Sequence, residues 1–224
     1  MKRIGLLVLL IGVCAGAHAA QCDATAEAAE ESKNVELFNG KDFSGWELYL
    51  SNEGANPKNT WSVVDGVVHC NGKERGYMRT KEQYSDYRLR LQWRFPGEPG
   101  NSGVLLHIQL PDMVWPKSIE SQLHHENAGD FWVIEGAEFE EHADPDNKRV
   151  NGRRTIKLHD SSEKPVGEWN QYEIVCDGDT IKSYVNGVLQ NEANGCSITK
   201  GYIGLQSEGA PIQFREIILE PLGE

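Results

Sequence analysis

From Val35 onward, apolar and polar residues alternate in short stretches that are separated by glycine, proline, aspartate or asparagine. The clearest stretch covers residues 87–95, where aromatic residues or leucine at odd positions alternate with arginine or glutamine at even positions. Because the side chains of a strand point alternately to its two faces, this stretch is predicted to be a strand with one buried and one solvated face. No stretch combines helical periodicity with helix caps for more than a turn or two, so we predict an all-β chain.

The same period predicts a series of short strands without intervening helices. Strands are predicted over residues 61–69, 87–95, 103–109, 118–124, 132–134, 155–158, 170–176, 180–185, 201–206 and 212–219. Asp65-Gly66 divides the first of these into a hairpin and Asn186-Gly187 predicts another, because these dipeptides accept the positive φ angles of tight turns. Such a series is typical of a sandwich or barrel, and we predict a single β-sandwich domain over residues 35–224.

The first residues predict a secretory signal peptide over residues 1–19. Lys2 and Arg3 precede an apolar run at residues 4–13, and Ala17-His18-Ala19 is a small-x-small cleavage site. The apolar run is shorter than the roughly 20 residues that span a bilayer, so no transmembrane helix is expected.

The predicted location follows from this signal peptide. We expect a periplasmic or secreted protein, and the alternative is lipid anchoring at the outer membrane through Cys14. Residues 20–34 are rich in alanine and glutamate and contain no aromatic residue. They have little to bury and are predicted to form a polar tether.

Composition narrows the classes of partner. Hydrophobic residues make up 39% of the chain and charged residues 25%, as in ordinary globular proteins. Asp and Glu number 34 against 22 Lys and Arg, which gives a formal net charge of -12. Nucleic acids and anionic membrane surfaces are therefore not expected as partners, and a neutral or cationic ligand is favoured.

Export would make disulfide bonds possible among the four cysteines that remain after the signal peptide, Cys22, Cys70, Cys176 and Cys196. Three pairings exist and the sequence does not rank them, although Cys176 with Cys196 is the pair to test first. The alternative is that some of these cysteines are small buried residues with free thiols.

Two predicted strands carry polar residues that suit acid-base chemistry. If the strands over residues 103–109 and 118–124 are neighbours, alternation predicts a polar cluster of His107, Gln109, Glu120, Gln122 and His124. This set offers an acid, a base and amide hydrogen bonds. The alternative is that the same residues form an ordinary solvated face of a sandwich.

Aromatic residues near predicted loops point to a sugar ligand. Trp115 and Trp132 lie next to loop residues, and Asn101 lies on a turn rich in glycine and proline. Aromatic rings stack on the C–H faces of sugars, while neighbouring polar groups bind the hydroxyls. The predicted substrate-binding residues are Gln122, Trp115, Lys117, Asn101, Gln109 and Trp132. No GxSxG, Walker, GxGxxG or HExxH motif occurs, so serine-hydrolase, nucleotide-binding and zincin chemistry have no support.

An ordered set of short motifs resembles the 3-keto-disaccharide hydrolase family. The motifs are Leu37-Phe38-Asn39-Gly40, Trp61-Ser62-Val63-Val64-Asp65-Gly66, Gly100-Asn101-Ser102-Gly103-Val104, Glu120-Ser121-Gln122, Gly167-Glu168-Trp169-Asn170 and Gly201-Tyr202-Ile203-Gly204-Leu205-Gln206. The resemblance implies a concanavalin A-like, laminin-G-like jelly roll of two antiparallel sheets. It also implies an exported bacterial enzyme that acts on glycosides whose sugar carries a ketone at C3, and a partner oxidoreductase that makes such 3-keto sugars.

The chemistry of that substrate class indicates which residues to expect. A ketone at C3 acidifies the C2 proton, so a base can remove it, the group at C1 can be eliminated, and water can then add at C1. Glu120 or His107 is the expected base, with the other or His124 as the acid. Lys117 could polarise the ketone, or a divalent metal ion could do so, held by Glu120, His107 and Asp130.

Two other functions remain open from the sequence. A conventional glycoside hydrolase would pair Glu120 with Glu138, Asp130 or Glu208 and would cleave unoxidised sugars through an oxocarbenium-like transition state. A non-catalytic carbohydrate-binding module would use the same fold and the same aromatic residues without turnover.

Overall fold

The computed structural model describes Met1 and residues 34–223. The chain divides into two units, residues 1–31 and residues 32–224, and every helix and strand of the described residues belongs to the second. The predicted signal peptide over residues 1–19 and the predicted tether over residues 20–34 lie outside the described residues, apart from Met1 and Asn34. Among the helices of the described part, none has the length and apolar character needed to cross a membrane.

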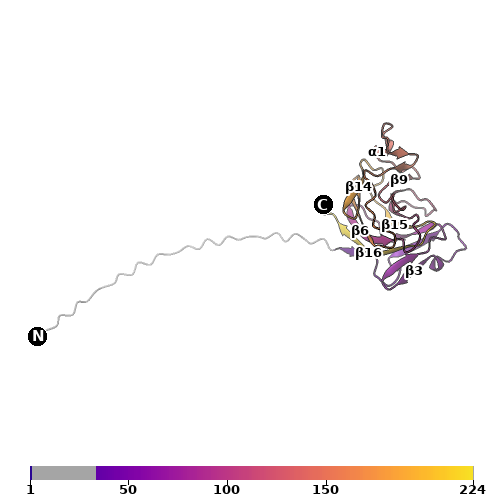
Figure 1. The fold of residues 1–224 in the computed structure, drawn as a ribbon, viewed down its shortest axis with the longest axis horizontal. Coiled ribbons are helices and arrows are strands. Elements are labelled where there is room, and N and C mark those ends of the chain that lie inside the picture. Colours follow the sequence, from indigo (N-terminus) through magenta and orange to yellow (C-terminus); the bar gives the residue numbers. More distant parts are fainter. Residues whose placement is uncertain (2–33, 224) are drawn as a thin grey trace. The chain divides into compact units, whose positions relative to one another are not determined.

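The second unit is built from two antiparallel sheets that pack face to face (Figure 1). Sheet A contains β1 (Val35–Glu36), β3 (Trp61–Val64), β4 (Val67–Cys70), β6 (Tyr87–Arg94), β12 (Asn170–Asp177), β13 (Thr180–Val185), β14 (Val188–Ala193) and β16 (Ile212–Pro221). Its strand order is β14-β13-β12-β6-β16-β4-β3, with β1 paired to β16. The predicted all-β sandwich of two antiparallel sheets is therefore confirmed.

Sheet B lies across from it and carries the candidate site. It contains β2 (Trp46–Leu50), β5 (Gly76–Thr80), β7 (Gly103–Ile108), β8 (Ser118–Gln122), β9 (Phe131–Ile134), β10 (Val150–Asn151), β11 (Arg154–Thr155) and β15 (Tyr202–Ser207). Its order is β10-β11-β9-β8-β7-β15-β5-β2. One turn of 3-10 helix, η1 (Pro57–Asn59), and one short helix, α1 (Glu140–Ala143), complete the domain, and α1 lies at the end opposite β3 (Figure 1).

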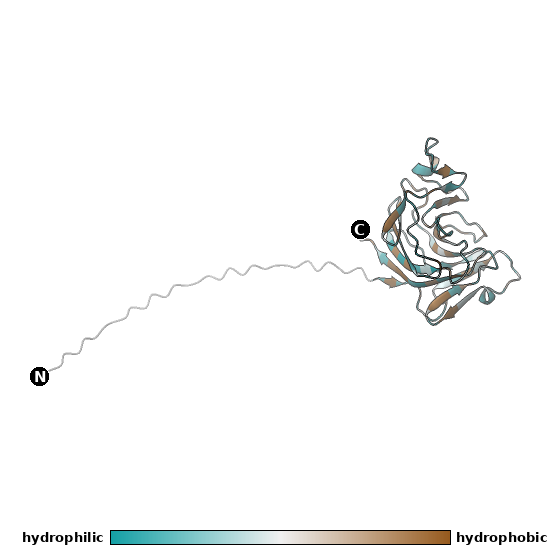
Figure 2. Cartoon of the chain, viewed as in Figure 1, coloured by the Kyte–Doolittle hydropathy of each residue, from teal (hydrophilic) through white to brown (hydrophobic). Residues whose placement is uncertain are grey.

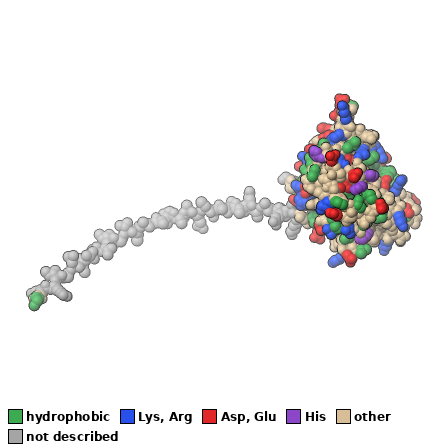
Figure 3. Space-filling model, in the orientation of Figure 1, with side chains coloured by type: hydrophobic (Ala, Val, Ile, Leu, Met, Phe, Trp, Pro, Cys, Tyr) green, Lys and Arg blue, Asp and Glu red, His purple; other side chains and the backbone are tan. Residues whose placement is uncertain are grey.

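The core forms because the two sheets bury the apolar sides of their strands against each other. Along β6 the burial alternates residue by residue, as the sequence pattern predicted, with Leu89, Leu91 and Trp93 inside. Brown and teal residues mix along the strands in Figure 2, as expected where one side of a strand is buried. On the face shown in Figure 3, acidic and basic side chains are mixed over the described surface.

Both predicted hairpins are present. Asp65 and Gly66 have φ values of 50° and 76° between β3 and β4. Asn186 and Gly187 have φ values of 49° and 82° between β13 and β14. These positive angles match the twist of the flanking strands, which is why the two dipeptides identify the turns from sequence.

Other boundaries differ from the prediction. The predicted strand over residues 155–158 is reduced to β11, and β2 and β5 are additional strands. All five residues of β5 are buried, because the outer face of sheet B is covered as well as its inner face. Strands buried on both faces lose the alternation of apolar and polar residues that made the other strands recognisable.

The structure also corrects the prediction of a disulfide bond. Cys70, Cys176 and Cys196 are buried free thiols, so the Cys176–Cys196 disulfide suggested from sequence is not formed. Burial raises the pKa of Cys176 to about 12, which keeps its thiol protonated at neutral pH. Cys14 and Cys22 lie outside the described residues.

A buried group of hydroxyls joins the two sheets. Ser121 of β8 in sheet B lies 2.6 Å from both Tyr172 Oη and Ser183 Oγ, which belong to β12 and β13 of sheet A. The Tyr172 hydroxyl also donates to the backbone oxygen of Gln122 at 3.2 Å. All three hydroxyl-bearing residues are fully buried. In such a place each hydroxyl depends on the others for its hydrogen bonds.

We expect Ser121→Ala to lower the free energy of unfolding by roughly 1–3 kcal/mol, because it leaves Ser183 and Tyr172 short of a buried partner. Urea denaturation followed by tryptophan fluorescence measures this. The matched control is Ser62→Ala, at an exposed serine of β3, which should change the value by no more than about 0.5 kcal/mol. Equal effects of the two substitutions would contradict a stabilising role for the buried hydrogen bonds of Ser121.

Candidate active site

The candidate site lies on the face of sheet B that points away from sheet A. Strand pairing sets Leu105 opposite Glu120 and Glu120 opposite Trp132, so these side chains share one face. Gly103 and Gln122 form the next row on that face. A cavity of about 160 Å³ opens there, which we call the Glu120 cavity. Its lining is Asn101, Trp115, Glu120, Gln122, Trp132, Ile134, Arg153 and Glu208.

Gly103 decides where the Glu120 side chain lies. A Cβ placed on Gly103 would lie 2.3 Å from Glu120 Oε1 and 2.8 Å from its Cγ. The carboxyl group therefore packs directly over the glycine backbone, in space that any other residue would occupy. This contact gives a structural reason for the glycine in the Asn101-Ser102-Gly103 motif.

The Glu120 carboxyl is set up to hold a proton. The residue is only 5% exposed. Burial first and the Glu208 carboxylate second raise the pKa of Glu120 to about 8, while Arg153 opposes the rise. Burial also raises the pKa of Glu208, and here Arg75 and Arg153 oppose it. Because desolvation and a like charge both disfavour ionisation, Glu120 is the carboxylic acid of this cavity at neutral pH.

Several polar atoms of the cavity wall have no protein partner. Asn101 Oδ1, Glu120 Oε1, Gln122 Oε1 and Trp132 Nε1 are buried and form no hydrogen bond within the described part of the chain. Asn101 uses its amide nitrogen to donate to Glu208 Oε2 at 2.9 Å. Buried polar atoms in native proteins are nearly always hydrogen-bonded, so their gathering here marks a place for a polar ligand.

The aromatic wall is held by a clamp outside the cavity. Trp115 belongs to the segment between β7 and β8, which folds over the outer face of sheet B. Asp112 of this segment receives two hydrogen bonds of 2.8 Å from Arg79 and one of 2.9 Å from Tyr77. The Arg79 guanidinium also stacks on the Tyr202 ring, 4.5 Å from its centroid. The bidentate pair ties the segment to β5 and so holds Trp115 beside Glu120.

His107 is not part of this site. The pairing of β7 with β15 shifts register between Tyr202 and Gly204, and His107 has a φ of 55°. The irregularity breaks the alternation, and the His107 ring lies in the core, 5.7 Å from the Tyr87 ring centroid. Its Nδ1 lies 3.1 Å from the backbone oxygen of Ile198, and burial lowers its pKa. The predicted common face for His107 and Glu120 was therefore wrong.

The remaining predicted residues divide into three groups. Asn101, Trp115, Gln122 and Trp132 line the Glu120 cavity. His124 lines a neighbouring cavity instead. Gln109 and Lys117 line neither.

Gln109 has a backbone role that explains its absence from the site. Its amide nitrogen donates to the backbone oxygens of His107, at 2.9 Å, and Lys200, at 2.7 Å. The backbone oxygen of Lys117 in turn accepts from the Gln109 N–H at 2.9 Å. These bonds hold the end of β7, so Gln109 supports the strand rather than the cavity.

The predicted metal ligands do not come together. Asp130 is fully buried, and its carboxylate accepts hydrogen bonds from Arg154 Nε at 2.6 Å and from the backbone N–H of Lys157 at 2.8 Å. Glu120 and His107 lie on opposite sides of sheet B. Among the described residues there is no group of three or more His, Cys, Asp or Glu side chains that could hold a metal ion. The trio proposed from sequence therefore does not fit a metal, and a metal requirement stays a prediction.

Sequence reasoning missed Arg153, the cationic group of the cavity. Arg153 follows the β10 strand in a two-stranded hairpin, and its guanidinium lies 5.8 Å from the Trp132 ring centroid. The signal was the Arg153-Arg154 pair, a basic doublet in an acidic chain. Of the three carboxylates considered as partners for Glu120, only Glu208 lines its cavity, and Glu138 is exposed.

The two packed antiparallel sheets define the fold class, the concanavalin A-like jelly rolls. A candidate glycosyl hydrolase of Parabacteroides distasonis superposes with a TM-score of 0.63 at 22% identity, covering 85% of this chain and 94% of that one. The β-glucanase of Bacillus licheniformis superposes with a TM-score of 0.58 at 15% identity, covering 87% of this chain and all of that one (100%). At these identities the likeness shows the fold alone.

Sequence comparison places the chain in a specific family. The profile of the 3-keto-alpha-glucoside-1,2-lyase-like domain matches residues 33–220, so the chain belongs to this family. A 3-keto-disaccharide hydrolase of Bacteroides thetaiotaomicron is 24% identical over 194 residues, which cover 79% of this chain. The match spans 62% of the length of that relative. The resemblance noted from the sequence motifs is thereby confirmed.

The raised pKa of Glu120 makes stability depend on pH. Below the ordinary value of 4.5 both the folded and the unfolded states hold the proton. As the pH rises from 4.5 to about 8, the unfolded state ionises while folded Glu120 stays protonated, so the free energy of unfolding falls. Above about 8 the loss is complete.

We expect Glu120→Gln to remove this loss, so that the variant gains stability over the wild type, by an amount on the order of a few kcal/mol, between pH 5 and pH 9. Chemical denaturation across that range measures the difference. Glu138→Gln, at an exposed glutamate, is the control and should track the wild type. If Glu120→Gln also tracks the wild type, Glu120 ionises as an ordinary acid.

Proposed function

We propose that this chain cleaves glycosides whose sugar carries a ketone at C3, through elimination at C1 and C2 followed by addition of water. One observation carries the proposal. A carboxylic acid with a pKa of about 8, Glu120, shares a cavity with a second carboxyl group, Glu208, and with Arg153. Elimination needs an acid, a base and a group that stabilises an enolate, and this cavity contains one of each.

The raised pKa of Glu120 gives this residue the role of the acid and leaves the role of the base to Glu208. Glu208, as the carboxylate, takes the C2 proton, and the electron pair of the C2–H bond is delocalised into the C3 ketone as an enolate. The enolate collapses to a C1–C2 double bond and expels the oxygen at C1, which receives the Glu120 proton. Arg153 is the cation available to the enolate oxygen. Addition of water then delivers hydroxyl to C1 and a proton to C2, and the two carboxyl groups regain their starting states.

The remaining wall suits a sugar. The unpartnered oxygens of Asn101 and Gln122 accept from hydroxyl groups, and the indole N–H of Trp132 donates to a sugar oxygen. Trp115 supplies an aromatic surface on which a sugar ring can stack. The substrate is thus a small carbohydrate.

The proposal extends to the source of the substrate and to the location of the enzyme. The name of the Bacteroides thetaiotaomicron relative, a 3-keto-disaccharide hydrolase, supports the substrate class. A C3 ketone is made by oxidising a C3 hydroxyl, so an oxidoreductase must act before this enzyme. We place the enzyme in the periplasm or outside the cell, with lipid anchoring through Cys14 as the alternative.

A second function has one observation in its favour. The same two carboxyl groups, Glu120 and Glu208, line one cavity, as a conventional glycoside hydrolase requires. In that case a C3 hydroxyl would serve as well as a C3 ketone. The two functions therefore differ in their requirement for the ketone. A carbohydrate-binding module would instead bind both sugars and cleave neither.

The test is turnover of a matched methyl glucoside and methyl 3-ketoglucoside by the purified domain, followed by NMR, with and without EDTA. We expect cleavage of the ketone form alone, and a loss of kcat of about 10²- to 10⁴-fold in both Glu120→Gln and Glu208→Gln. Glu138→Gln should retain wild-type kcat. Cleavage of the plain glucoside would favour the second function, and wild-type activity of Glu120→Gln would remove this residue from the mechanism. Inhibition by EDTA would establish the metal requirement.

Substitution of His107 tests whether this residue contributes to stability or to catalysis. We expect His107→Ala to lower the melting temperature, because it opens a cavity beside Tyr87. Its kcat per folded molecule should stay within about threefold of the wild type, since the ring does not line the Glu120 cavity. A loss of kcat comparable to that of Glu120→Gln, in protein whose circular dichroism spectrum is unchanged, would return His107 to the mechanism.

A further inference from the structure

Gln206 of β15 is a buried glutamine whose side-chain amide has no hydrogen-bond partner. The residue is only 1% exposed. Neither its Oε1 nor its Nε2 forms a hydrogen bond with any described residue. Buried polar groups without partners are rare in native proteins, and a role in catalysis is one reason for keeping them.

Strand pairing places Gln206 beside the carboxyl group of Glu120. Two pairs of residues bracket its position, Leu205 with Val104 and Glu208 with Asn101. Their common register sets Gln206 opposite Gly103. The Glu120 carboxyl fills the space over Gly103, with Oε1 only 2.3 Å from where a Cβ of that residue would lie. Because opposed Cβ atoms of antiparallel strands are about 4.5–5.5 Å apart, the Gln206 amide is a neighbour of this carboxyl group.

Gln206 also shares a face with the second carboxyl group of the site. Leu205 packs in the core between the sheets, so the side chain of Gln206 points to the outer face of sheet B. Tyr77, which pairs with Gln206, belongs to the apolar cluster on that outer face. Glu208 comes two residues later in the chain and lines the Glu120 cavity. Gln206 is therefore flanked by Glu120 across the strand pair and by Glu208 along the chain.

The position of Gln206 reserves its amide for these two carboxyl groups. Asn101 and Gln122 line the cavity, where a sugar can contact them, whereas Gln206 does not line it. An amide oxygen only accepts a hydrogen bond and an amide nitrogen only donates one. A single amide between two carboxyl groups therefore favours the state in which one carboxyl group is protonated and the other is ionised.

We propose that Gln206 is a positioning residue that links the two carboxyl groups of the site. Its amide oxygen accepts a hydrogen bond from protonated Glu120, and its amide nitrogen donates one to the Glu208 carboxylate, directly or through one water. These bonds tighten when substrate fills the cavity, as contacts between catalytic groups commonly do. The consequence for catalysis rests on the function proposed above, whereas the link itself does not.

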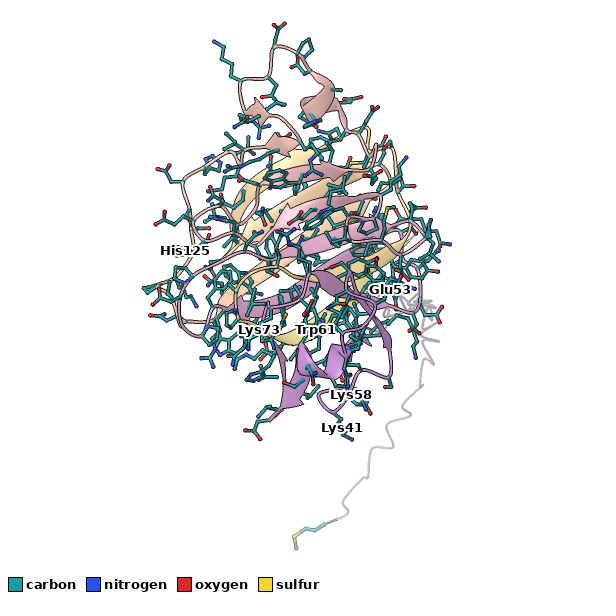
Figure 4. All side chains as sticks on the ribbon, turned by 90° about the vertical axis from the view of Figure 1, so that its right-hand side faces the viewer. Lys41, Glu53, Lys58, Trp61, Lys73 and His125 are labelled. Carbon is teal, nitrogen blue, oxygen red and sulfur yellow. The ribbon has the colours of Figure 1, made fainter. Side chains whose placement is uncertain are left out.

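The charged groups around the two carboxyl groups do not supply this link. Arg153 favours the ionised form of both Glu120 and Glu208, and Arg75 favours the ionised form of Glu208. Arg75 lies on the segment between β4 and β5, which the label of Lys73 locates in Figure 4. A guanidinium group cannot accept a hydrogen bond, so neither arginine can stabilise the proton of Glu120.

The test is a titration of the two carboxyl groups in the purified domain without substrate. Carbon-13 at the glutamate carboxyl carbons is followed by NMR, and Glu120→Gln and Glu208→Gln assign the two signals. In Gln206→Met, which replaces the amide with an apolar side chain of similar length, we expect the pKa of Glu120 to fall and that of Glu208 to rise. Each should move by about 0.5 to 1 pH unit, as loss of one hydrogen bond implies.

The direction of these changes distinguishes the link from a structural role. Removal of a polar neighbour without a link disfavours both carboxylates, so both pKa values would rise together. A rise of both, or no change in either, would overturn the proposal. Gln213→Met, at a buried glutamine of β16 in sheet A, is the control and should leave both values unchanged. Gln206→Leu repeats the titration if Gln206→Met does not fold.

Activity gives a second readout of the same variant. With methyl 3-ketoglucoside, we expect Gln206→Met to lower kcat about 10- to 100-fold with KM within about twofold, and to narrow the pH profile of kcat from both sides. A wild-type kcat and pH profile would contradict a positioning role in the reaction. If the wild type cleaves neither keto substrate, the proposed function fails, and the titration alone decides whether Gln206 links the two carboxyl groups.

Discussion

The carboxyl group of Glu120 lies almost wholly out of water, against a wall that contains a second carboxyl group, Glu208. Burial and the like charge of Glu208 raise the pKa of Glu120 to about 8, so Glu120 holds its proton at neutral pH. The arrangement is possible because Gly103 has no side chain where the Glu120 carboxyl packs. The proposed elimination depends on this proton.

Strand β8 connects the Glu120 carboxyl group to the rest of the fold. Ser121 points into the sandwich and joins the buried hydroxyls of sheet A, while its neighbours Glu120 and Gln122 point to the opposite face. The strand that carries the acid is therefore anchored from behind by hydrogen bonds in a place where their loss is costly. On the outer side, Asp112 clamps the Trp115 segment to Arg79. The site lies between two rigid attachments, as precise positioning of an acid requires.

Two cavities adjoin on the outer face of sheet B and share part of their walls. One contains the carboxyl groups and Arg153, and the other presents neutral hydrogen-bonding groups around an ion pair that is internally satisfied. Asn101, Gln122 and Trp132 line both cavities.

By itself, the sequence determined the sandwich, its two hairpin turns, and the shared face of Glu120 and Gln122, because these follow from a period of two and from the local φ preferences of Asx-Gly pairs. Tertiary structure alone decided the rest. The irregular pairing of β7 with β15 turned His107 into the core, and the covered outer face of sheet B hid β5 from periodicity. Arg153 and Glu208 reach Glu120 from distant positions in the chain, and burial of that group, a property of packing rather than of neighbours in sequence, sets its pKa.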